Sequence, residues 1–341
     1  MTDKTATTEK LDVAVLGCGS WGTALAILLA NNQHNVGIWG KNTAHLEQME
    51  SQRCNSKYLP GVTFPPTLNV IHSLEKCVSL ANRLLIVIPT AGVLPILKDI
   101  SNYAFNSETK IIFASKGFEP QNSQLFHSVV SEIFTSNFSY CVISGPTFAK
   151  EVAKGLPTAI TVASENIAFS QEVSSFLTNQ NFRAYTSSDV IGVEVGGAVK
   201  NVMAIAAGIS DGMGFGSNTR AALITRGLHE ITQLGNKLGG RPETFMGLAG
   251  IGDLVLTCTD DQSRNRRIGL GLAAGKTIQQ IQSEIGQCAE GVGTTKRVFQ
   301  LAKKLDVDMP IVEQVYNVIY HNKSPKQAVV DLMNRAIRAE N

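Results

Sequence analysis

The sequence has 341 residues, and 43% of them are hydrophobic. At roughly 150 residues per domain, this length suits about two domains that each bury a core, which excludes disordered, collagen-like and mini-protein classes. The formal net charge is +2, from 30 basic and 28 acidic residues. This balance disfavours a nucleic-acid partner or a polybasic membrane surface, so any recognition of anions must be local.

No sorting signal stands out in the sequence. The first ten residues, MTDKTATTEK, are polar and include acids, unlike a secretory signal or an Arg-rich transit peptide. No apolar stretch approaches the roughly 20 residues that cross a bilayer. The six cysteines form no CxxC pair, and no His/Cys cluster has the spacing of a metal site. We therefore expect a cytoplasmic protein with reduced thiols, no membrane span and no metal.

The first chemical motif is a glycine-rich turn. An apolar run, Asp12 to Leu16, precedes Gly17-Cys18-Gly19-Ser20-Trp21-Gly22, and an Ala/Leu-rich helix pattern follows from Thr23 to Ala30. A second strand pattern, Asn35 to Trp39, completes the strand, turn, helix, strand order in which GxGxxG binds a dinucleotide.

Each glycine of this motif has a separate expected role. Gly17 permits the tight turn, Gly19 lets the backbone approach a pyrophosphate, and Gly22 lets the helix pack on the strand. The alternative is a turn with a structural role only. Trp21 suits either a core position or one that covers the cofactor.

The end of the second strand bears on the choice of cofactor. NAD-specific enzymes usually place an acid there to bind the ribose 2'-hydroxyl, but this sequence has Gly40-Lys41-Asn42. Because a lysine attracts a 2'-phosphate, we expect NADPH to bind at least as well as NADH. A solvated surface lysine is the alternative.

Further apolar runs predict a doubly wound parallel sheet. The runs are Arg83 to Ile88, Lys110 to Ala114, Tyr140 to Ile143, Thr158 to Ala163 and Phe182 to Tyr185. Ligands of such sheets bind beyond the carboxyl ends of the strands, where this sequence has Ser115-Lys116-Gly117 and Ser144-Gly145-Pro146-Thr147. Lys116 is the one charge among these strand ends, and a solvated loop lysine is its alternative.

After Ser187-Ser188-Asp189, a helix-capping cluster, the strand pattern stops. We therefore predict an α/β domain over residues 1–190 and an all-helical domain over residues 191–341. Asp308-Met309-Pro310 resembles a helix start with proline in the first turn. The predicted helices are Val190 to Ala207, Asn218 to Leu238, Ser263 to Ala274, Thr294 to Leu305, Ile311 to Tyr320 and Pro325 to Glu340.

Lys200 is the sole cation of the first of these helices. Helical spacing places Gly196, Gly197, Met203 and Ala204 on its face, and no acid lies at i−4 or i+4. Burial among small apolar residues would lower its pKa and prepare it to exchange a proton near neutrality. A lysine that reaches solvent from a buried stem is the alternative.

A second polar constellation lies between Gly247 and Arg267. Asp253 has Gly-rich, apolar neighbours, where a carboxylate needs a partner. The segment Thr257 to Ser263 resembles a loop that opens a helix, so Ser263, Arg264 and Asn265 would offer a first turn of groups that bind phosphate. A solvated, Arg-rich helix face is the alternative.

Six segments together resemble the bacterial NAD(P)-dependent glycerol-3-phosphate dehydrogenases. They are VLGCGSWGTALA, ASKG, ISGPTFAKEVAKGLPTA, GGAVKN, GLAGIGDLVLTCT and SRNRR, and the resemblance extends from about Leu11 to Asn334. It implies a Rossmann-type domain followed by an all-helical domain, as in 6-phosphogluconate dehydrogenases. It also implies the reversible reduction of dihydroxyacetone phosphate to sn-glycerol 3-phosphate for glycerophospholipid synthesis, with NADPH/NADP and NADH/NAD as cofactors.

The resemblance also implies site residues, with Lys200 as proton donor in reduction and acceptor in the reverse direction. Cys288 stands where relatives often have an aliphatic residue, and a helix-capping or surface glutamate is the alternative for Glu290. The implied substrate contacts are Lys116, Gly145, Thr147, Lys200, Asp253, Ser263, Arg264 and Asn265. The implied cofactor contacts are Ser20, Trp21, Lys41, Lys116, Ala149, Arg264, Cys288 and Glu290, besides Gly17, Gly19 and Gly22 of the turn.

Two other functions are compatible with parts of this pattern. A 3-hydroxyacid or 6-phosphogluconate-type dehydrogenase would share the Rossmann domain, the helical domain and the helix lysine. A dinucleotide-binding redox sensor would share the glycine turn, but the sequence shows no helix-turn-helix or basic patch. A homodimer is the oligomeric state that we expect.

Overall fold

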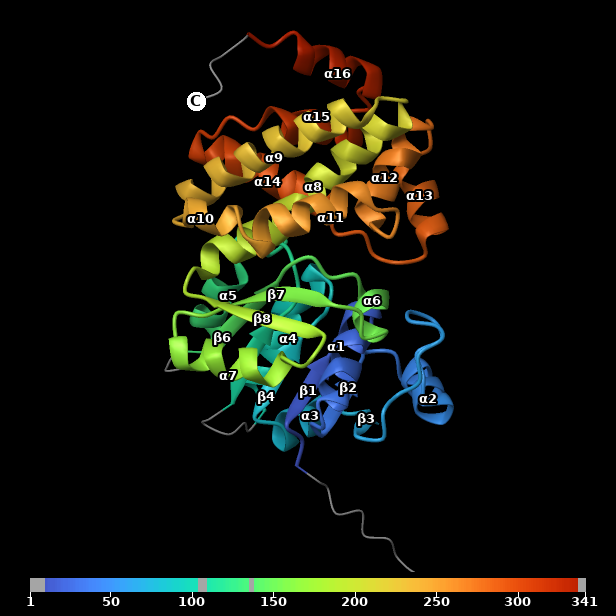
Figure 1. The fold of residues 1–341 in the computed structure, drawn as a ribbon, viewed down its shortest axis with the longest axis vertical. Helices are drawn as coiled ribbons and strands as arrows, with labels where there is room; N and C mark the ends of the chain where they lie inside the picture. The colour runs from blue at the N-terminus through green and yellow to red at the C-terminus, as the bar shows by residue number, and fades with distance from the viewer. Residues whose placement is uncertain (1–9, 104–108, 135–137, 337–341) are drawn as a thin grey trace, which may run out of the picture. The chain divides into compact units, whose positions relative to one another are not determined.

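The structure is a computed structural model that describes residues 10–103, 109–134 and 138–336 (Figure 1). The chain forms two compact units. We call the first the sheet unit; it comprises Met1–Ser115, His127–Ile143 and Thr147–Ser188. We call the second the helical unit; it comprises Lys116–Phe126, Ser144–Pro146 and Asp189–Asn341. Two short segments that follow strands of the sheet therefore belong to the helical unit.

The sheet unit contains one sheet of eight strands in the order β3-β2-β1-β4-β5-β6-β7-β8. Each pair whose register is described runs parallel, and Val13 of β1 pairs with Val36 of β2. This confirms the predicted doubly wound sheet. The strands are β1 (Val13–Leu16), β2 (Val36–Trp39), β3 (Leu68–Val70), β4 (Arg83–Ile86), β5 (Lys110–Phe113), β6 (Tyr140–Ser144), β7 (Thr158–Ala163) and β8 (Phe182–Ser187).

The helices of the sheet unit follow strands and begin at polar caps. Asn42 accepts a hydrogen bond from His45 N at the start of α2, and Asn166 accepts one from Phe169 N at the start of α7. Helix α1 is buried from Gly22 to Ala30, which explains its apolar sequence. The helices are α1 (Ser20–Asn31), α2 (Thr43–Gln52), α3 (Leu74–Leu80), α4 (Thr90–Ser101), α5 (Phe126–Ile133), α6 (Ala149–Ala153) and α7 (Ile167–Leu177).

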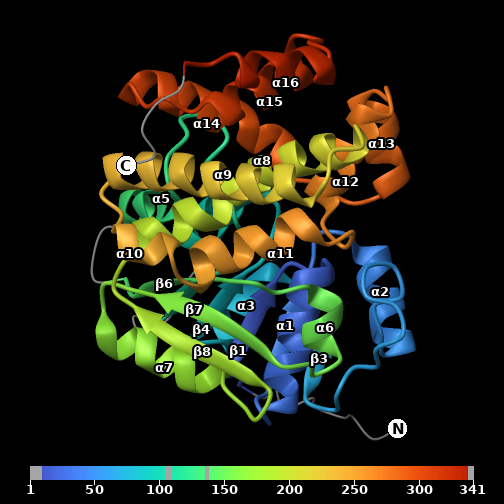
Figure 2. The same cartoon turned by 45° about the horizontal axis from the view of Figure 1, so that its top comes forward.

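The helical unit is built around α8 (Val190–Gly212), and Figures 1 and 2 show other helices of the unit packed along it. Among the described residues, α8 is the one helix long and apolar enough to suit a membrane span, but 94% of its most apolar window is buried. It therefore serves as the core helix. Its neighbours are α9 (Ser217–Lys237), α11 (Asp253–Thr259), α12 (Arg264–Ala273), α14 (Gly291–Leu305) and α15 (Pro310–Tyr320).

The predicted helix starts of this unit are present. Asp189 caps α8, since its Oδ1 accepts from Gly192 N at 2.9 Å. The Asp189 Oδ2 also accepts from Arg241 N and Thr244 Oγ1, which ties the start of α8 to α10 (Pro242–Phe245). Pro310 occupies the first turn of α15, as its sequence predicts.

Two predictions need correction, and several elements were not predicted. The last helix, α16 (Pro325–Met333), is shorter than predicted: Asn334 to 336 are not helical, and 337–340 lie outside the described residues. The predicted loop from Thr257 to Ser263 is helical in its first part, because α11 continues to Thr259. Sequence patterns gave no range for β3 and for α2 to α7 of the sheet unit. In the helical unit they gave none for α10, the π-helical turn η1 (Leu248–Gly252), α11 and α13 (Ile278–Ile285).

Candidate functional site

In the sheet unit, the glycine turn between β1 and α1 has a shape that only glycine allows. Gly17 has a φ of +127°, and a Cβ there would lie 2.2 Å from Val87 O. A Cβ at Gly22 would lie 1.9 Å from Gly17 O. A Cβ at Gly19 would meet no atom within 4 Å, so there is open space beside the backbone at the start of α1. This open backbone at a helix N-terminus fits the pyrophosphate of a dinucleotide.

The neighbouring predicted cofactor residues differ in their surroundings. Ser20 Oγ donates to Tyr58 O at 2.8 Å. Trp21 is half-buried, and its buried Nε1 has no hydrogen-bond partner in the described part of the chain. Lys41 is exposed and is the second residue after the carboxyl end of β2. These positions leave both interpretations of Trp21 open and keep Lys41 accessible to an anion.

In the helical unit, two lysines share one buried carboxylate. Lys200 Nζ lies 2.5 Å from Asp253 Oδ1, and Lys116 Nζ lies 2.7 Å from Asp253 Oδ2. Thr257 Oγ1 also accepts from Lys200 Nζ at 2.9 Å. Lys200 is 6% exposed and Asp253 is 1% exposed, so these charges are held away from bulk water. Asp253 thus has the partners that its apolar surroundings require.

Burial and the paired opposite charge shift the pKa values of Lys200 and Asp253 in opposite directions. Burial lowers the pKa of Lys200 to about 8; Asp253 opposes this shift and Lys116 adds to it. Burial would raise the pKa of Asp253, but the charges and hydrogen bonds of Lys116 and Lys200 outweigh it and hold that pKa below its usual value. The result is a lysine that releases a proton as the ammonium and takes one up as the amine near neutrality, beside a carboxylate that stays ionised.

Small residues on α8 explain how these groups come together. A Cβ at Gly196 would lie 2.5 Å from Ala249 O of η1, and one at Gly197 would lie 2.6 Å from Ser144 Oγ. Gly250 has non-helical φ and ψ of −101° and −105°, which kinks the chain before α11. This close approach and the kink set α11, with Asp253 in its first turn, against α8.

The start of α12 carries the predicted phosphate-binding group. Ser263 caps the helix, because its Oγ accepts from Arg266 N at 3.2 Å. Asn265 Nδ2 donates to Asn201 Oδ1 at 2.9 Å, which links this turn to the residue after Lys200. Arg264 is exposed and donates from Nη1 to Gln287 Oε1 at 3.3 Å. The turn therefore offers a guanidinium group at the positive end of a helix.

The remaining predicted residues lie in three places. Gly145 O accepts from Lys116 Nζ at 3.2 Å, so Gly145 belongs to the lysine cluster. Thr147 and Ala149 belong to the sheet unit, where Ala149 begins α6. Cys288 Sγ lies 3.7 Å from Glu290 Oε1, and partial burial of the thiol together with the Glu290 carboxylate raises its pKa to about 11. Glu290 occupies the N-cap position of α14, but its side chain makes no capping hydrogen bond.

Sequence patterns missed two residues that contact the predicted ones. Thr257 was placed in a loop, so its position one helical turn after Asp253 was not seen. Asn201 follows Lys200 directly, and its amide bond to Asn265 joins α8 to α12. A pairing of polar residues at i and i+4 could have indicated Thr257 once α11 was predicted as a helix.

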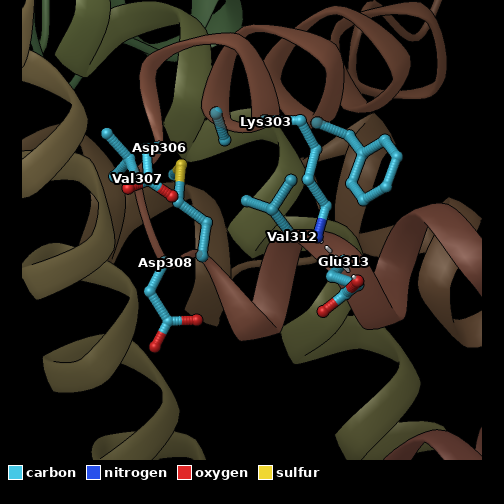
Figure 3. Close-up of a pocket in the computed structure, with 9 residues that line it drawn as sticks. Lys303, Asp306, Val307, Asp308, Val312 and Glu313 are labelled. Atoms are coloured by element: carbon cyan, nitrogen blue, oxygen red, sulfur yellow. Dashed lines mark hydrogen bonds and ion pairs between the residues drawn. The ribbon is translucent and has the colours of Figure 1, made fainter.

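The described residues form no metal site, and their one described pocket is separate from the predicted site residues. No group of three or more His, Cys, Asp or Glu side chains in the described ranges could hold a metal ion. A surface pocket between α14 and α15 contains none of the predicted site residues (Figure 3). Two ion pairs involve its lining residues: Lys303 Nζ lies 3.3 Å from Glu313 Oε1, and Asp308 Oδ2 accepts from Arg335 Nη2 at 2.6 Å.

Comparisons with known proteins agree with this arrangement. Residues 12–170 match the model for the NAD-dependent glycerol-3-phosphate dehydrogenase N-terminus, and residues 189–330 match the model for the C-terminus of the same family. A glycerol-3-phosphate dehydrogenase [NAD(P)+] from Colwellia psychrerythraea is 51% identical over 324 residues, which are 95% of this chain and 97% of that protein. One from Nitrosococcus oceani is 51% identical over 332 residues, or 97% and 96% of the two chains.

Solved structures show the same similarity. The crystal structure of glycerol-3-phosphate dehydrogenase from Coxiella burnetii has a TM-score of 0.93 at 44% identity, covering 96% of this chain and 99% of that one. A D-mandelate dehydrogenase structure with NADH has a TM-score of 0.59 at 12% identity, over 91% of this chain and 98% of that one. The second similarity shows a shared fold alone.

Proposed function

The chain belongs to the family of NAD(P)-dependent glycerol-3-phosphate dehydrogenases, and from this we propose that its buried Lys200, paired with Asp253, carries the proton transfer of the family's reaction. The enzyme is an oxidoreductase that interconverts dihydroxyacetone phosphate and sn-glycerol 3-phosphate with NAD(P). The observation that supports Lys200 is its 2.5 Å contact with a buried carboxylate, together with a pKa lowered to about 8. A group with these properties can act as both acid and base near neutrality.

Reduction of the ketone forms an alkoxide that needs a proton. Lys200 Nζ donates this proton to the carbonyl oxygen, and in the oxidation direction it accepts the proton from the hydroxyl. The dinucleotide, when bound, supplies or receives the hydride. Asp253 keeps Lys200 charged and oriented, and Lys116 adds a second ammonium group that favours the developing negative charge.

The substrate phosphate gives the enzyme a second point of attachment. We assign it to the start of α12, where Arg264 and the helix N-terminus attract an anion. Binding at a group remote from the carbonyl fixes the position of the reacting carbon. The proposed substrate contacts are Lys116, Gly145, Thr147, Lys200, Asp253, Ser263, Arg264 and Asn265.

The cofactor is assigned first to the glycine turn. The open space at Gly19 and the positive end of α1 support binding of the pyrophosphate there. Lys41 supports binding of a 2'-phosphate because it is exposed at the end of β2. The proposed contacts are Gly17, Gly19, Ser20, Trp21, Gly22, Lys41, Lys116, Ala149, Arg264, Cys288 and Glu290.

We also propose a functional division of the chain near residue 190, with cofactor binding before it and the substrate and catalytic groups after it. The segments that carry Lys116 and Gly145 precede residue 190 but form part of the compact helical unit. The other proposed contacts that depart from this division are Thr147 for the substrate and Arg264, Cys288 and Glu290 for the cofactor. A cytoplasmic homodimer that supplies glycerophospholipid synthesis is the state we propose in the cell. Light scattering of the purified chain tests the dimer, and a monomer mass would contradict it.

The direct test of the proposed function is the oxidation of NADPH and NADH, followed by absorbance, with dihydroxyacetone phosphate as substrate. We expect turnover by the wild-type chain and turnover lower by about a hundredfold or more by Lys200→Ala. Small 3-oxo acids in place of dihydroxyacetone phosphate test the 3-hydroxyacid dehydrogenase alternative, and turnover with them alone would overturn the proposal. A redox sensor would bind the dinucleotide without turnover of either substrate.

A further inference from the structure

Asn55 has a buried side chain that touches the glycine turn of the sheet unit. It follows α2 in the chain, and its relative exposure is 0%. Its Nδ2 donates to Cys18 O and to Thr23 Oγ1, both at 2.8 Å. Its Oδ1 accepts from Tyr58 N at 3.1 Å and lies 3.0 Å from His45 Nε2. The amide therefore uses its full hydrogen-bonding capacity on the turn, α1, α2 and its own segment.

The partners settle the direction of each hydrogen bond. Cys18 O can only accept, so the nitrogen of the Asn55 amide faces the turn and the oxygen faces His45. His45 Nε2 therefore donates, which leaves its Nδ1 to accept from Cys18 Sγ at 3.6 Å. Burial raises the pKa of the Cys18 thiol, so the sulfur keeps the proton that this bond needs. Cys18, His45 and Asn55 thus form a closed ring of hydrogen bonds around the turn.

This ring fixes the orientation of one peptide group. The described chain contains no cis peptide bond, and a trans peptide points its C=O and N–H in opposite directions. Because Asn55 holds the Cys18 carbonyl, the N–H of Gly19 must point away from Asn55. We find no hydrogen bond from Gly19 N–H within the described ranges, and the space beside Gly19 is open.

We infer that Asn55 is a positioning residue for the cofactor: it orients the Gly19 N–H toward the pyrophosphate by holding the carbonyl of the same peptide. The inference rests on the cofactor binding proposed above for this turn. Without the Asn55 amide, the peptide between Cys18 and Gly19 can rotate. The Gly19 N–H is then no longer oriented toward the pyrophosphate before the cofactor binds. The loss should weaken the binding of every dinucleotide, since all of them share the pyrophosphate.

The test measures Kd for NADPH and for NADH by nucleotide fluorescence with the full chain. For Asn55→Ala we expect both Kd values to rise by about tenfold or more and by similar factors, while kcat at saturating NADPH and KM for dihydroxyacetone phosphate change little. Asn55→Ser is a milder second variant, because a serine hydroxyl can still accept from Tyr58 N but is too short to reach Cys18 O. It should show the same pattern if Asn55→Ala does not fold.

The matched control is Asn166→Ala, which removes another helix-associated asparagine of the sheet unit, the cap of α7. It should lower Tm without a change in either Kd. If a folded Asn55 variant binds both nucleotides with Kd values within twofold of the wild type, the inference is overturned. A rise in Kd for NADPH alone would also overturn it, because that would indicate an effect through Lys41. A wild-type chain that binds neither nucleotide would overturn the proposed function itself.

Discussion

Lys200 Nζ lies 2.5 Å from Asp253 Oδ1, so a buried lysine of α8 and a buried carboxylate 53 positions later form one ion pair. Removing one partner of a buried pair leaves the other charge uncompensated. If Lys200 is removed, Asp253 keeps Lys116 as its partner, whereas removal of Asp253 takes the carboxylate away from both lysines. The three groups therefore act as a unit, and a change in one alters the proton affinity of another.

Asp253→Asn should shift the pH dependence of reduction. The neutral amide no longer supports the charge of Lys200, so burial and Lys116 lower its pKa further, below about 8. Reduction needs protonated Lys200, so kcat in the wild type should fall as pH rises above about 8, and in the variant the fall should begin at lower pH. We expect kcat to be at least about tenfold lower throughout. Profiles of kcat at saturating substrates check this, and an unshifted alkaline limb would contradict it.

Lys200→Ala should remove the proton donor and leave the fold intact. Asp253 keeps Lys116 as an ion-pair partner in this variant, so its carboxylate is not stranded. We expect kcat to fall by about a hundredfold to ten-thousandfold or more, with little change in Kd for NADPH. Steady-state kinetics and nucleotide fluorescence measure the two effects. Turnover close to wild type would remove Lys200 from the proton transfer.

Arg264→Ala should weaken substrate binding. Its guanidinium stands at the first position of α12, where we assign the substrate phosphate. We expect KM for dihydroxyacetone phosphate to rise by about tenfold or more, since a charge-assisted hydrogen bond is lost. KM for NADPH is measured in parallel because Arg264 is also a proposed cofactor contact. Arg267→Ala, an exposed arginine on the same helix, is the matched control, and equal KM values for both variants would argue against the phosphate site.

The parts of the fold predicted from sequence are those in which local pattern and burial coincide. The apolar runs of β1, β4 and β5 are buried strands, and Asp189 and Pro310 stand at helix starts as expected. Strand β3 was missed because it has three residues and its middle one, Asn69, is exposed. Helix α11 was missed because its run LVLTCT does not distinguish a short helix from a loop or strand.

The site was predicted residue by residue, but its connections were not. The need of Asp253 for a partner and the isolation of Lys200 were both visible in the sequence. That the two residues meet depends on the kink at Gly250 and on the close approach at Gly196, which are tertiary features. Asn55 gave no local signal, because a buried amide is recognised by its partners and not by the pattern around it.

Lys41→Asp should reverse any preference for NADPH. Lys41 is exposed at the carboxyl end of β2, the position where an acid binds the ribose 2'-hydroxyl of NAD and repels a 2'-phosphate. We expect the ratio of kcat/KM for NADPH to that for NADH to fall by about tenfold or more, mainly through KM for NADPH. Lys98→Asp, an exposed lysine in the last turn of α4, makes the same charge change elsewhere in the sheet unit and should leave the ratio unchanged. If Lys41→Asp and Lys98→Asp give the same ratio as the wild type, Lys41 is a solvated surface residue and the 2'-phosphate is bound by another group.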